Sequence, residues 1–350
     1  MTEKLKNDLL IKACRREPTP RTPVWIMRQA GRYLPEYQKV RAKADFMTMC
    51  HTPELAAEVT LQPVDILGVD AAIIFSDILV IPEAMGMTLN FHEGRGPVFK
   101  TPLRHARDFE KLRPVIPEEK LDFVLRALKL VNNELARRVP LIGFAGAPWT
   151  LAAYMVEGQG SKDFTHIKSL MYTSPGLLKN LLEKLSVAVA DFLGAQIHAG
   201  AQVVQIFDSW AGQLSPDDFR EFSLPYLKEV VQVIRRSGEP IIVFARDARF
   251  SLEALSKIGA DVLGLSWTAD LARARKQVAD RVAVQGNLDP CALFAPKDRL
   301  RSEVIKVLEK AGDGTGHIFN LGHGILPQTP VENAQALIEF VKQESVKLRS

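Results

Sequence analysis

Residues 240–266 read PIIVFARDARFSLEALSKIGADVLGLS, and the architecture follows from the pattern in this segment. An apolar run at 240–245 is followed by an amphipathic segment and then by a second apolar run at 262–266. Both runs are nearly continuous in hydrophobicity, which is typical of parallel strands covered on both faces. Gly259, just before the second run, is typical of the end of a helix. The segment therefore predicts a strand, a helix and a parallel strand.

The same pattern recurs along the whole chain. Eight predicted strands alternate with helices, without a linker or a change in composition, which favours one closed (β/α)₈ TIM barrel. We therefore expect a single α/β domain spanning residues 1–350, with a short N-terminal extension before the first strand. The strands are predicted at VWIMR (24–28), AAIIF (71–75), LIGFA (141–145), VVQIF (203–207), PIIVFA (240–245), VLGLS (262–266), VAVQG (282–286) and HIFNL (317–321).

Helix signals support this interpretation. Thr52, Ser215 and Thr329 each precede a proline, an arrangement typical of the first residues of a helix. An open, doubly wound sheet is the alternative, and it usually has a glycine fingerprint after its first strand. The first predicted strand is followed instead by RQAGRYLPEY (28–37), which does not fit GxGxxG.

Composition excludes several classes of protein. The chain has 47% hydrophobic and 25% charged residues, which is ordinary for a globular protein with a sizeable core. A net charge of +4 over 350 residues gives little support to nucleic-acid binding. The three cysteines form no CxxC pair, and neither a signal peptide nor a membrane span is evident, so we expect a cytoplasmic protein with reduced thiols.

Polar residues follow five of the predicted strands directly. The loops after parallel strands share one end of a barrel, where barrel enzymes have their active sites. We therefore expect these residues to converge on one site. They are Arg28 and Arg32 after the first strand, Asp77 after the second, Tyr154 after the third, Ser209 after the fourth and His323 after the eighth.

Each candidate also has a purely structural interpretation. Arg28 and Arg32 could be solvated charges on a helical turn, but Arg28 directly follows an apolar strand. Asp77 could cap a helix or form a structural ion pair, although apolar residues flank it on both sides. Tyr154 could simply be a packed hydroxyl group.

The remaining candidates leave similar alternatives open. Ser209 could be a packed hydroxyl group, and Asp208 could either contact a ligand or orient Ser209 or an arginine. His323, between two glycines, could be a turn residue. A zinc site needs three or four converging ligands, and this end offers no cysteine and no HExxH spacing.

Long segments of the chain resemble the uroporphyrinogen decarboxylase family. The first is the longest and most specific, and the matches extend over essentially the whole chain in the family's order. They are PVWIMRQAGRYLPEYQKVR (23–41), AAIIFSDILVIPEAMGM (71–87), GFAGAPWTLAAYMVEG (143–158), QIFDSWAGQLSPDDFREFSLPY (205–226), QGNLDP (285–290) and FNLGHGILPQTPVENAQALIEFVK (319–342).

The resemblance implies an activity and a set of roles. The reaction would be decarboxylation of the four acetate side chains of uroporphyrinogen III to methyl groups, in porphyrin and heme biosynthesis. It would need no metal and no organic cofactor, and the enzyme would be a homodimer. Asp77 would contact the pyrrole N–H groups and stabilise the intermediate, with Arg28 and Tyr154 as further catalytic residues. Substrate binding would fall to Arg28, Gln29, Ala30, Gly31, Arg32, Asp77, Tyr154, Ser209 and His323.

Two segments depart from the family pattern. ARDAR (245–249) stands where a glycine-containing stretch is commoner, and Ser266 stands where an aspartate is common. We expect these departures to affect substrate fit near the fifth and sixth predicted strands, and dimer contacts, without touching the residues named above. Two other functions fit the pattern less well: a methyltransferase that activates a thiol on zinc, and a non-catalytic module that binds polyanions.

Overall fold

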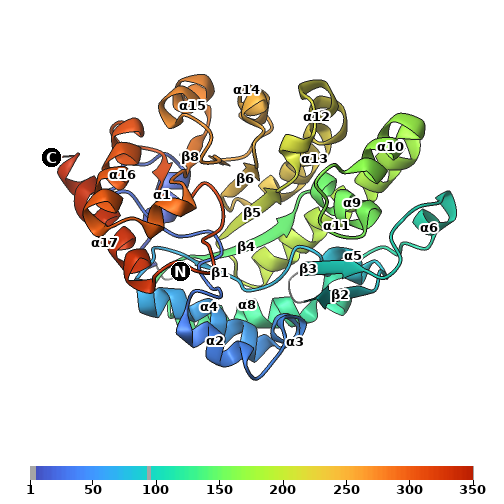
Figure 1. The fold of residues 1–350 in the computed structure, drawn as a ribbon, viewed down its shortest axis with the longest axis horizontal. Coiled ribbons are helices and arrows are strands. Elements are labelled where there is room, and N and C mark those ends of the chain that lie inside the picture. Colours follow the sequence, from blue (N-terminus) through green and yellow to red (C-terminus); the bar gives the residue numbers. More distant parts are fainter. Residues whose placement is uncertain (1–4, 93–95, 350) are drawn as a thin grey trace.

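The computed structural model describes residues 5–92 and 96–349. Seven parallel strands form one curled sheet in the order β1-β4-β5-β6-β7-β8-β9 (Figure 1). Their bounds are β1 (Ala72–Ile73), β4 (Leu141–Gly146), β5 (Val203–Asp208), β6 (Ile241–Ala245), β7 (Val262–Gly264), β8 (Ala283–Gln285) and β9 (His317–Ile318).

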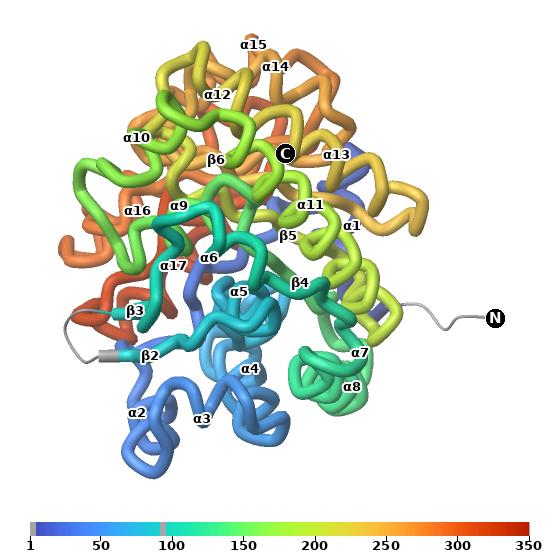
Figure 2. The backbone as a smooth tube through the Cα atoms, turned by 90° about the vertical axis from the view of Figure 1, so that its right-hand side faces the viewer, coloured from blue at the N-terminus to red at the C-terminus, as the bar shows by residue number. Residues whose placement is uncertain are grey.

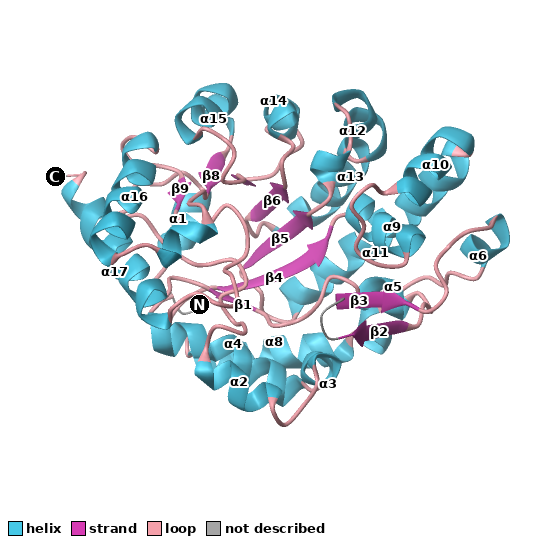
Figure 3. Cartoon of the chain, in the orientation of Figure 1, coloured by secondary structure: helices cyan, strands magenta, loops and turns pink. Residues whose placement is uncertain are grey.

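Helices surround the outside of this sheet (Figure 3). The α-helices are α1 (Leu9–Cys14), α2 (Pro35–Arg41), α3 (Phe46–His51), α4 (Pro53–Leu67), α5 (Val80–Ala84), α6 (Ala106–Glu110), α7 (Pro117–Lys120), α8 (Asp122–Leu135), α9 (Pro148–Glu157), α10 (Thr165–Thr173), α11 (Pro175–His198), α12 (Pro216–Phe222), α13 (Leu224–Ile234), α14 (Leu252–Leu255), α15 (Leu271–Val278), α16 (Lys297–Lys310) and α17 (Val331–Lys347). Short 3₁₀ turns are η1 (Ala211–Gln213), η2 (Arg235–Ser237), η3 (Arg249–Ser251), η4 (Ala279–Arg281) and η5 (Pro290–Phe294).

Seven of the predicted strands are confirmed, and the prediction for residues 24–28 is wrong. There the structure has only an isolated parallel bridge between Val24 and Phe319. The N–H of Ile26 donates to Oε1 of Gln29 (3.0 Å), and the N–H of Met27 donates to Oδ1 of Asn320 (2.9 Å). Because side-chain oxygens take these donors, the backbone does not form a regular ladder.

The segment at Val24 nevertheless fills the gap between the two edge strands. The N–H of Trp25 donates to the carbonyl of Phe319 beyond β9, and the N–H of Asp70 before β1 donates to the carbonyl of Val24 (2.8 Å). The sheet therefore closes into a TIM-barrel-like fold, as predicted, but through a few hydrogen bonds rather than a full eighth strand.

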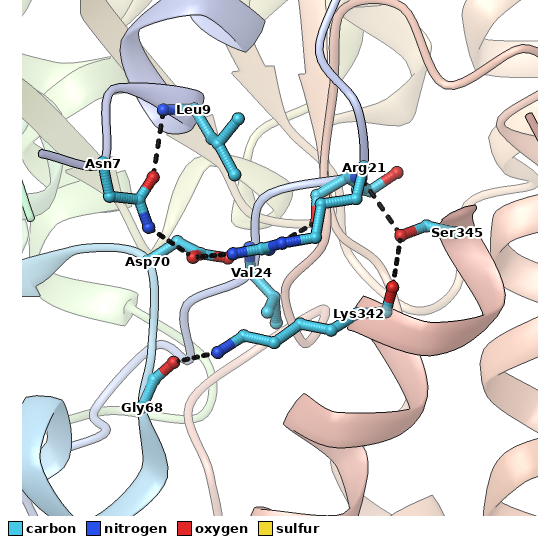
Figure 4. Close-up of polar contacts among 9 residues, drawn as sticks. Asn7, Leu9, Arg21, Val24, Gly68, Asp70, Lys342 and Ser345 are labelled. Carbon is cyan, nitrogen blue, oxygen red and sulfur yellow. Dashed lines mark hydrogen bonds and ion pairs between the residues drawn. The ribbon is translucent and has the colours of Figure 1, made fainter.

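Asp70 anchors this closure at the N-terminal end of β1 (Figure 4). Its carboxylate accepts two hydrogen bonds from the guanidinium of Arg21 (2.7 and 2.6 Å), one from Nδ2 of Asn7 (2.7 Å) and one from the N–H of Val24 (2.9 Å). Nearby, Nζ of Lys342 donates to the carbonyl of Gly68 (2.6 Å) and so attaches α17 to the same end.

The predicted helix starts are largely confirmed. Helix α12 begins after Ser215, whose Oγ accepts the N–H of Asp218, and α4 begins at Pro53. Helix α17 begins one residue later than predicted, at Val331, with Pro330 as its capping residue.

A hairpin outside the barrel was not predicted from the sequence. Strands β2 (Leu89–His92) and β3 (Gly96–Phe99) are antiparallel and lie apart from the barrel sheet (Figure 2). Phe91 of the hairpin packs on Phe46 of α3, with ring centroids 4.6 Å apart. Across the described residues, no helix is both long and apolar enough to cross a membrane.

Candidate active site

Arg28 lies in the loop that follows the segment at Val24, which closes the barrel between β9 and β1. Its backbone is left-handed (φ 62°), a conformation that is strained for a side chain with a Cβ and is common at functional sites. The side chain lies against Gly324, where a Cβ would be 2.8 Å from Cγ of Arg28. Glycine at 324 therefore makes room for Arg28, which brings together the loops after the first and last predicted strands.

Asp77 lies between β1 and α5. Its Oδ1 accepts the N–H of Leu79 (2.8 Å), the residue that precedes α5. Asp77 therefore does help to start this helix, which was the structural interpretation of the residue. No hydrogen bond to Oδ2 is found within the described residues. Burial raises the pKa of the Asp77 carboxyl above its usual value, while the N–H of Leu79 and the charge of Arg28 partly offset this.

Arg28 and Asp77 are close enough to affect each other's charge, although no ion pair within 4 Å joins them in the described part of the chain. Loss of hydration lowers the pKa of the Arg28 guanidinium, and Tyr154 and Asp77 partly restore it. Part of the Arg28 side chain is nevertheless exposed. A partly exposed arginine side chain that is otherwise surrounded by protein is suited to binding an anionic ligand.

Tyr154 of α9 faces the same pair. Burial, and then the charge of Asp77, raise the pKa of its phenol to about 12, so the group is protonated at neutral pH. Its ring packs near that of Trp210, with centroids 5.8 Å apart.

His323 follows β9. Its Nδ1 accepts the N–H of Gly324 (2.6 Å), which leaves the ring proton on Nε2. Burial, with the positive charges of Arg28 and Arg246, lowers the pKa of His323 to about 3. The ring is therefore a neutral hydrogen-bond donor at physiological pH.

Arg28, Asp77, Tyr154 and His323 thus come together as predicted, whereas other predicted residues lie less directly on this group. Arg32 is exposed, and its charge acts on Arg28 rather than on Asp77.

Gln29 and Ser209 are also less direct members of the site. The Gln29 side chain is buried and already used, because Nε2 donates to the carbonyl of Ala71 (3.0 Å) and Oε1 accepts the N–H of Ile26. Ser209 is half-buried just after β5, and no hydrogen bond of its hydroxyl group is found in the described ranges.

The neighbouring Asp208 holds two other hydroxyl groups rather than Ser209 or an arginine. Its buried carboxylate accepts the hydroxyl groups of Thr150 on α9 (2.6 Å) and Ser223 (2.7 Å). Burial raises its pKa to about 6, although these two hydrogen bonds act in the opposite direction. Asp208 therefore holds α9, and with it Tyr154, against the end of β5.

Arg246, directly after β6, was not among the predicted site residues. We expected residues 245–249 not to affect the other site residues, and this is wrong. The positive charge of Arg246 acts on Arg28, Tyr154 and His323. A usable signal was present, because Arg246 directly follows an apolar strand just as Arg28 follows residues 24–27.

A row of aromatic rings was also missed. Phe144, Phe207 and Phe244 lie near the ends of β4, β5 and β6, with successive centroids 5.7 and 6.2 Å apart. The ring of His323 lies 6.5 Å beyond Phe244. These rings supply apolar surface beside the charged groups, which suits a ligand that is both aromatic and acidic.

An open groove of about 560 Å³ lies elsewhere, along α2 and α4. None of the predicted site residues lines it. Its lining carries five acids, including Glu54 and Glu58, against two lysines, and this excess of negative charge disfavours a polycarboxylate. Among the described residues, no group of three His, Cys, Asp or Glu side chains is placed to hold a metal ion.

Comparison with known proteins gives one consistent result. The model of the family described as uroporphyrinogen decarboxylase matches residues 5–344. A uroporphyrinogen decarboxylase from Chloroherpeton thalassium is 55% identical, and the alignment covers 98% of this chain and 99% of the relative. The chain belongs to the uroporphyrinogen decarboxylase family. Another relative with that name, from Chlorobaculum tepidum, is 53% identical over the same shares of the two chains.

Solved structures share the fold of this uroporphyrinogen decarboxylase family member. A methyltransferase from Methanosarcina mazei superposes with a TM-score of 0.82 at 22% identity and covers 97% of this chain and 99% of its own. A B12-independent methionine synthase from Shewanella gives 0.57 at 12% identity, with 85% and 89% of the two chains covered. At such identities the likeness concerns the fold alone.

Proposed function

We propose that this chain is a uroporphyrinogen decarboxylase, which converts the four acetate side chains of uroporphyrinogen III to methyl groups and releases four molecules of CO₂. The product is coproporphyrinogen III. The main support is membership of the family over residues 5–344, together with Asp77 and Arg28 near each other at the strand ends.

Each decarboxylation breaks the bond between the acetate CH₂ and its carboxylate, and the electron pair left behind must be accepted. A pyrrole ring that takes up a proton on carbon becomes a cation and accepts this pair. A second proton on the CH₂ carbon completes the methyl group, and the ring proton is returned. The net reaction consumes one proton for each CO₂, and no metal or organic cofactor is required.

Asp77 stabilises this cationic ring by accepting hydrogen bonds from the pyrrole N–H groups. Oδ1 is fixed by the N–H of Leu79, so Oδ2 is the oxygen available to substrate. Opposite charges about 4 Å apart interact by roughly 4 kcal/mol at an effective dielectric constant of 20. That corresponds to a rate factor on the order of 10³. The carboxylate is in position before the charge develops.

Arginine suits the substrate carboxylates because its planar fork can bind both oxygens at once. Arg28 and Arg32 take this role, with the backbone of residues 29–31 beside them. Nε2–H of His323 and the phenol of Tyr154 are neutral donors on the same site, and Ser209 lines it near β5.

The ring proton needs an acid. Arg28 is our candidate among the protein groups, because loss of hydration and the charge of Arg246 both lower its pKa. A bound water molecule and a carboxyl group of the substrate are the alternatives.

The test is incubation of the purified protein with uroporphyrinogen III, with and without a chelator, and chromatography of the products. Coproporphyrinogen formed equally under both conditions is the expected result. Product that depends on metal would favour metal-assisted chemistry, such as a zinc methyltransferase site would use. Binding of substrate without product would favour a non-catalytic polyanion-binding module.

We also propose that the protein is a cytoplasmic homodimer, as the family resemblance implies. Cys14, Cys50 and Cys291 are free thiols, which suits a reducing compartment. Light scattering of the purified protein tests the dimer.

A further inference from the structure

The side chain of Arg246 has unused hydrogen-bonding capacity. Its Nε is buried and lies 3.2 Å from Oδ2 of Asp247, an ion-pair contact that lacks hydrogen-bond geometry. No partner for the two terminal nitrogens is found among the described residues. Arginine is almost always charged, so a guanidinium in this state provides binding capacity for an anion.

Trp267 forms a platform for this guanidinium. Cζ of Arg246 lies over its indole ring, 5.7 Å from the centroid. Two contacts fix the platform. Nδ2 of Asn287 donates to the carbonyls of Ser266 and Ala269, both at 2.8 Å, and the backbone of Trp267 packs so closely on Gly322 that no Cβ would fit there.

The loop carrying Arg246 is also held from the side of β7. Asp247 is left-handed (φ 59°), and its N–H donates to Oγ of Ser266 (2.8 Å). Oγ1 of Thr268 donates to Oδ1 of Asp247 (3.2 Å). The two departures from the family pattern, residues 245–249 and Ser266, are therefore joined by a hydrogen bond.

Arg246 is adjacent to the proposed catalytic group. The rings of Trp267 and His323 are stacked, with centroids 6.2 Å apart. The charge of Arg246 acts on Arg28, and both charges act on His323. In the barrel order, β6 is the fifth of eight positions if the Val24 segment is counted first, so it is diametrically opposite that segment.

We propose that Arg246 binds a side-chain carboxylate of the porphyrinogen on the β6 side of the site, across from Arg28 and Arg32. This assignment rests on the proposed function. A tetrapyrrole has carboxylates on all sides of its ring, so binding from one side alone would leave the far side chains without partners. Trp267 and Ser266 are positioning residues, because they act through Arg246.

The experiment compares wild type with Arg246→Met, Arg246→Lys and the matched control Arg249→Met. Arg249 is an exposed arginine in the same loop, and its Nη1 donates to the carbonyl of Thr268 (3.3 Å). Loss of one charge-assisted hydrogen bond should raise KM for uroporphyrinogen about tenfold to hundredfold in Arg246→Met. Partial recovery is expected in Arg246→Lys, and no change in Arg249→Met.

Partly decarboxylated intermediates provide a second measurement. Weakened holding of side-chain carboxylates should increase the released seven-, six- and five-carboxylate species in Arg246→Met. KM within threefold of wild type and an unchanged product profile would overturn the proposal. If Arg246→Met fails to fold, Arg246→Gln is measured in the same way and decides in its place.

Failure of the proposed function would be visible separately, because wild type would then release no CO₂ from uroporphyrinogen. Binding of the unreactive oxidised substrate, uroporphyrin, measured by fluorescence, then decides the assignment of Arg246. Weaker binding to Arg246→Met but not to Arg249→Met would support it, and equal binding would refute it. Ser266→Ala should raise KM without lowering kcat, and should add nothing in an Arg246→Met background.

Discussion

The two carboxylate oxygens of Asp77 have different surroundings. One accepts the N–H of Leu79, and the other has no hydrogen bond within the described ranges. Asp77→Asn preserves the hydrogen bond to Leu79 and removes the charge. We therefore expect the fold to persist, by circular dichroism, and kcat for coproporphyrinogen formation to fall about 10³-fold. Turnover near the wild-type rate would remove the electrostatic role assigned to Asp77.

His323 offers a second test at the scale of a single residue. Because burial and two arginines lower its pKa to about 3, the ring stays neutral throughout the working pH range and donates through Nε2. Glutamine can place an amide N–H near that position, whereas leucine cannot. We expect His323→Leu to raise KM about tenfold or more and His323→Gln to stay closer to wild type. Equal effects of the two substitutions would show that Nε2–H contributes no hydrogen bond to the substrate.

The closing segment at Val24 is the element on which the barrel depends. It makes one bridge and a few single hydrogen bonds, and Asp70 joins it to β1 through four donors. Removal of one partner of a buried ion pair typically costs about 3–5 kcal/mol. We expect Asp70→Asn to lower the free energy of unfolding in urea by this amount.

Asp65→Asn is the matched control for that prediction. Asp65 also pairs with an arginine, Arg138, at 2.6 Å, but the two side chains are 55% and 41% exposed. Exposed pairs are worth about 0–1 kcal/mol, so this variant should remain close to wild type. A similar decrease in the free energy of unfolding in both variants would mean that the hydrogen bonds to Asp70 do not hold the barrel closed.

At the scale of the whole molecule, two buried groups make the stability of the fold depend on pH in opposite directions. Asp208 has a raised pKa of about 6 in the folded protein, so its contribution is present in acid and is lost as the pH rises through about 6. His317 has a lowered pKa of about 4, so its contribution is present above pH 6.5 and is lost as the pH falls toward 4. Each effect is on the order of 3 kcal/mol.

Asp208→Asn removes only the first of these effects. The stability of the variant should therefore fall more steeply than that of wild type as the pH is lowered from 6.5 to 4. The difference between the two free energies of unfolding should grow by up to about 3 kcal/mol over that range. Urea titrations at a series of pH values measure it, and a difference that is constant with pH would mean that Asp208 ionises normally in the fold.

The sequence by itself determined seven of the barrel strands and their alternation with helices, the parallel direction of the barrel sheet and the end at which Arg28, Asp77, Tyr154 and His323 meet. These properties follow from local hydrophobic patterns and from the rule that loops after parallel strands share one end. Only the tertiary structure decided which side chains are placed to line the proposed site. The Gln29 side chain is buried and hydrogen-bonded to the backbone of Ala71. Residues 24–28 close the barrel without forming a regular strand, and the guanidinium of Arg246 lies over the ring of Trp267. Each of these outcomes depends on backbone conformation and on hydrogen bonds to residues distant in the sequence, such as Asn320 and Ser266, which no local pattern specifies.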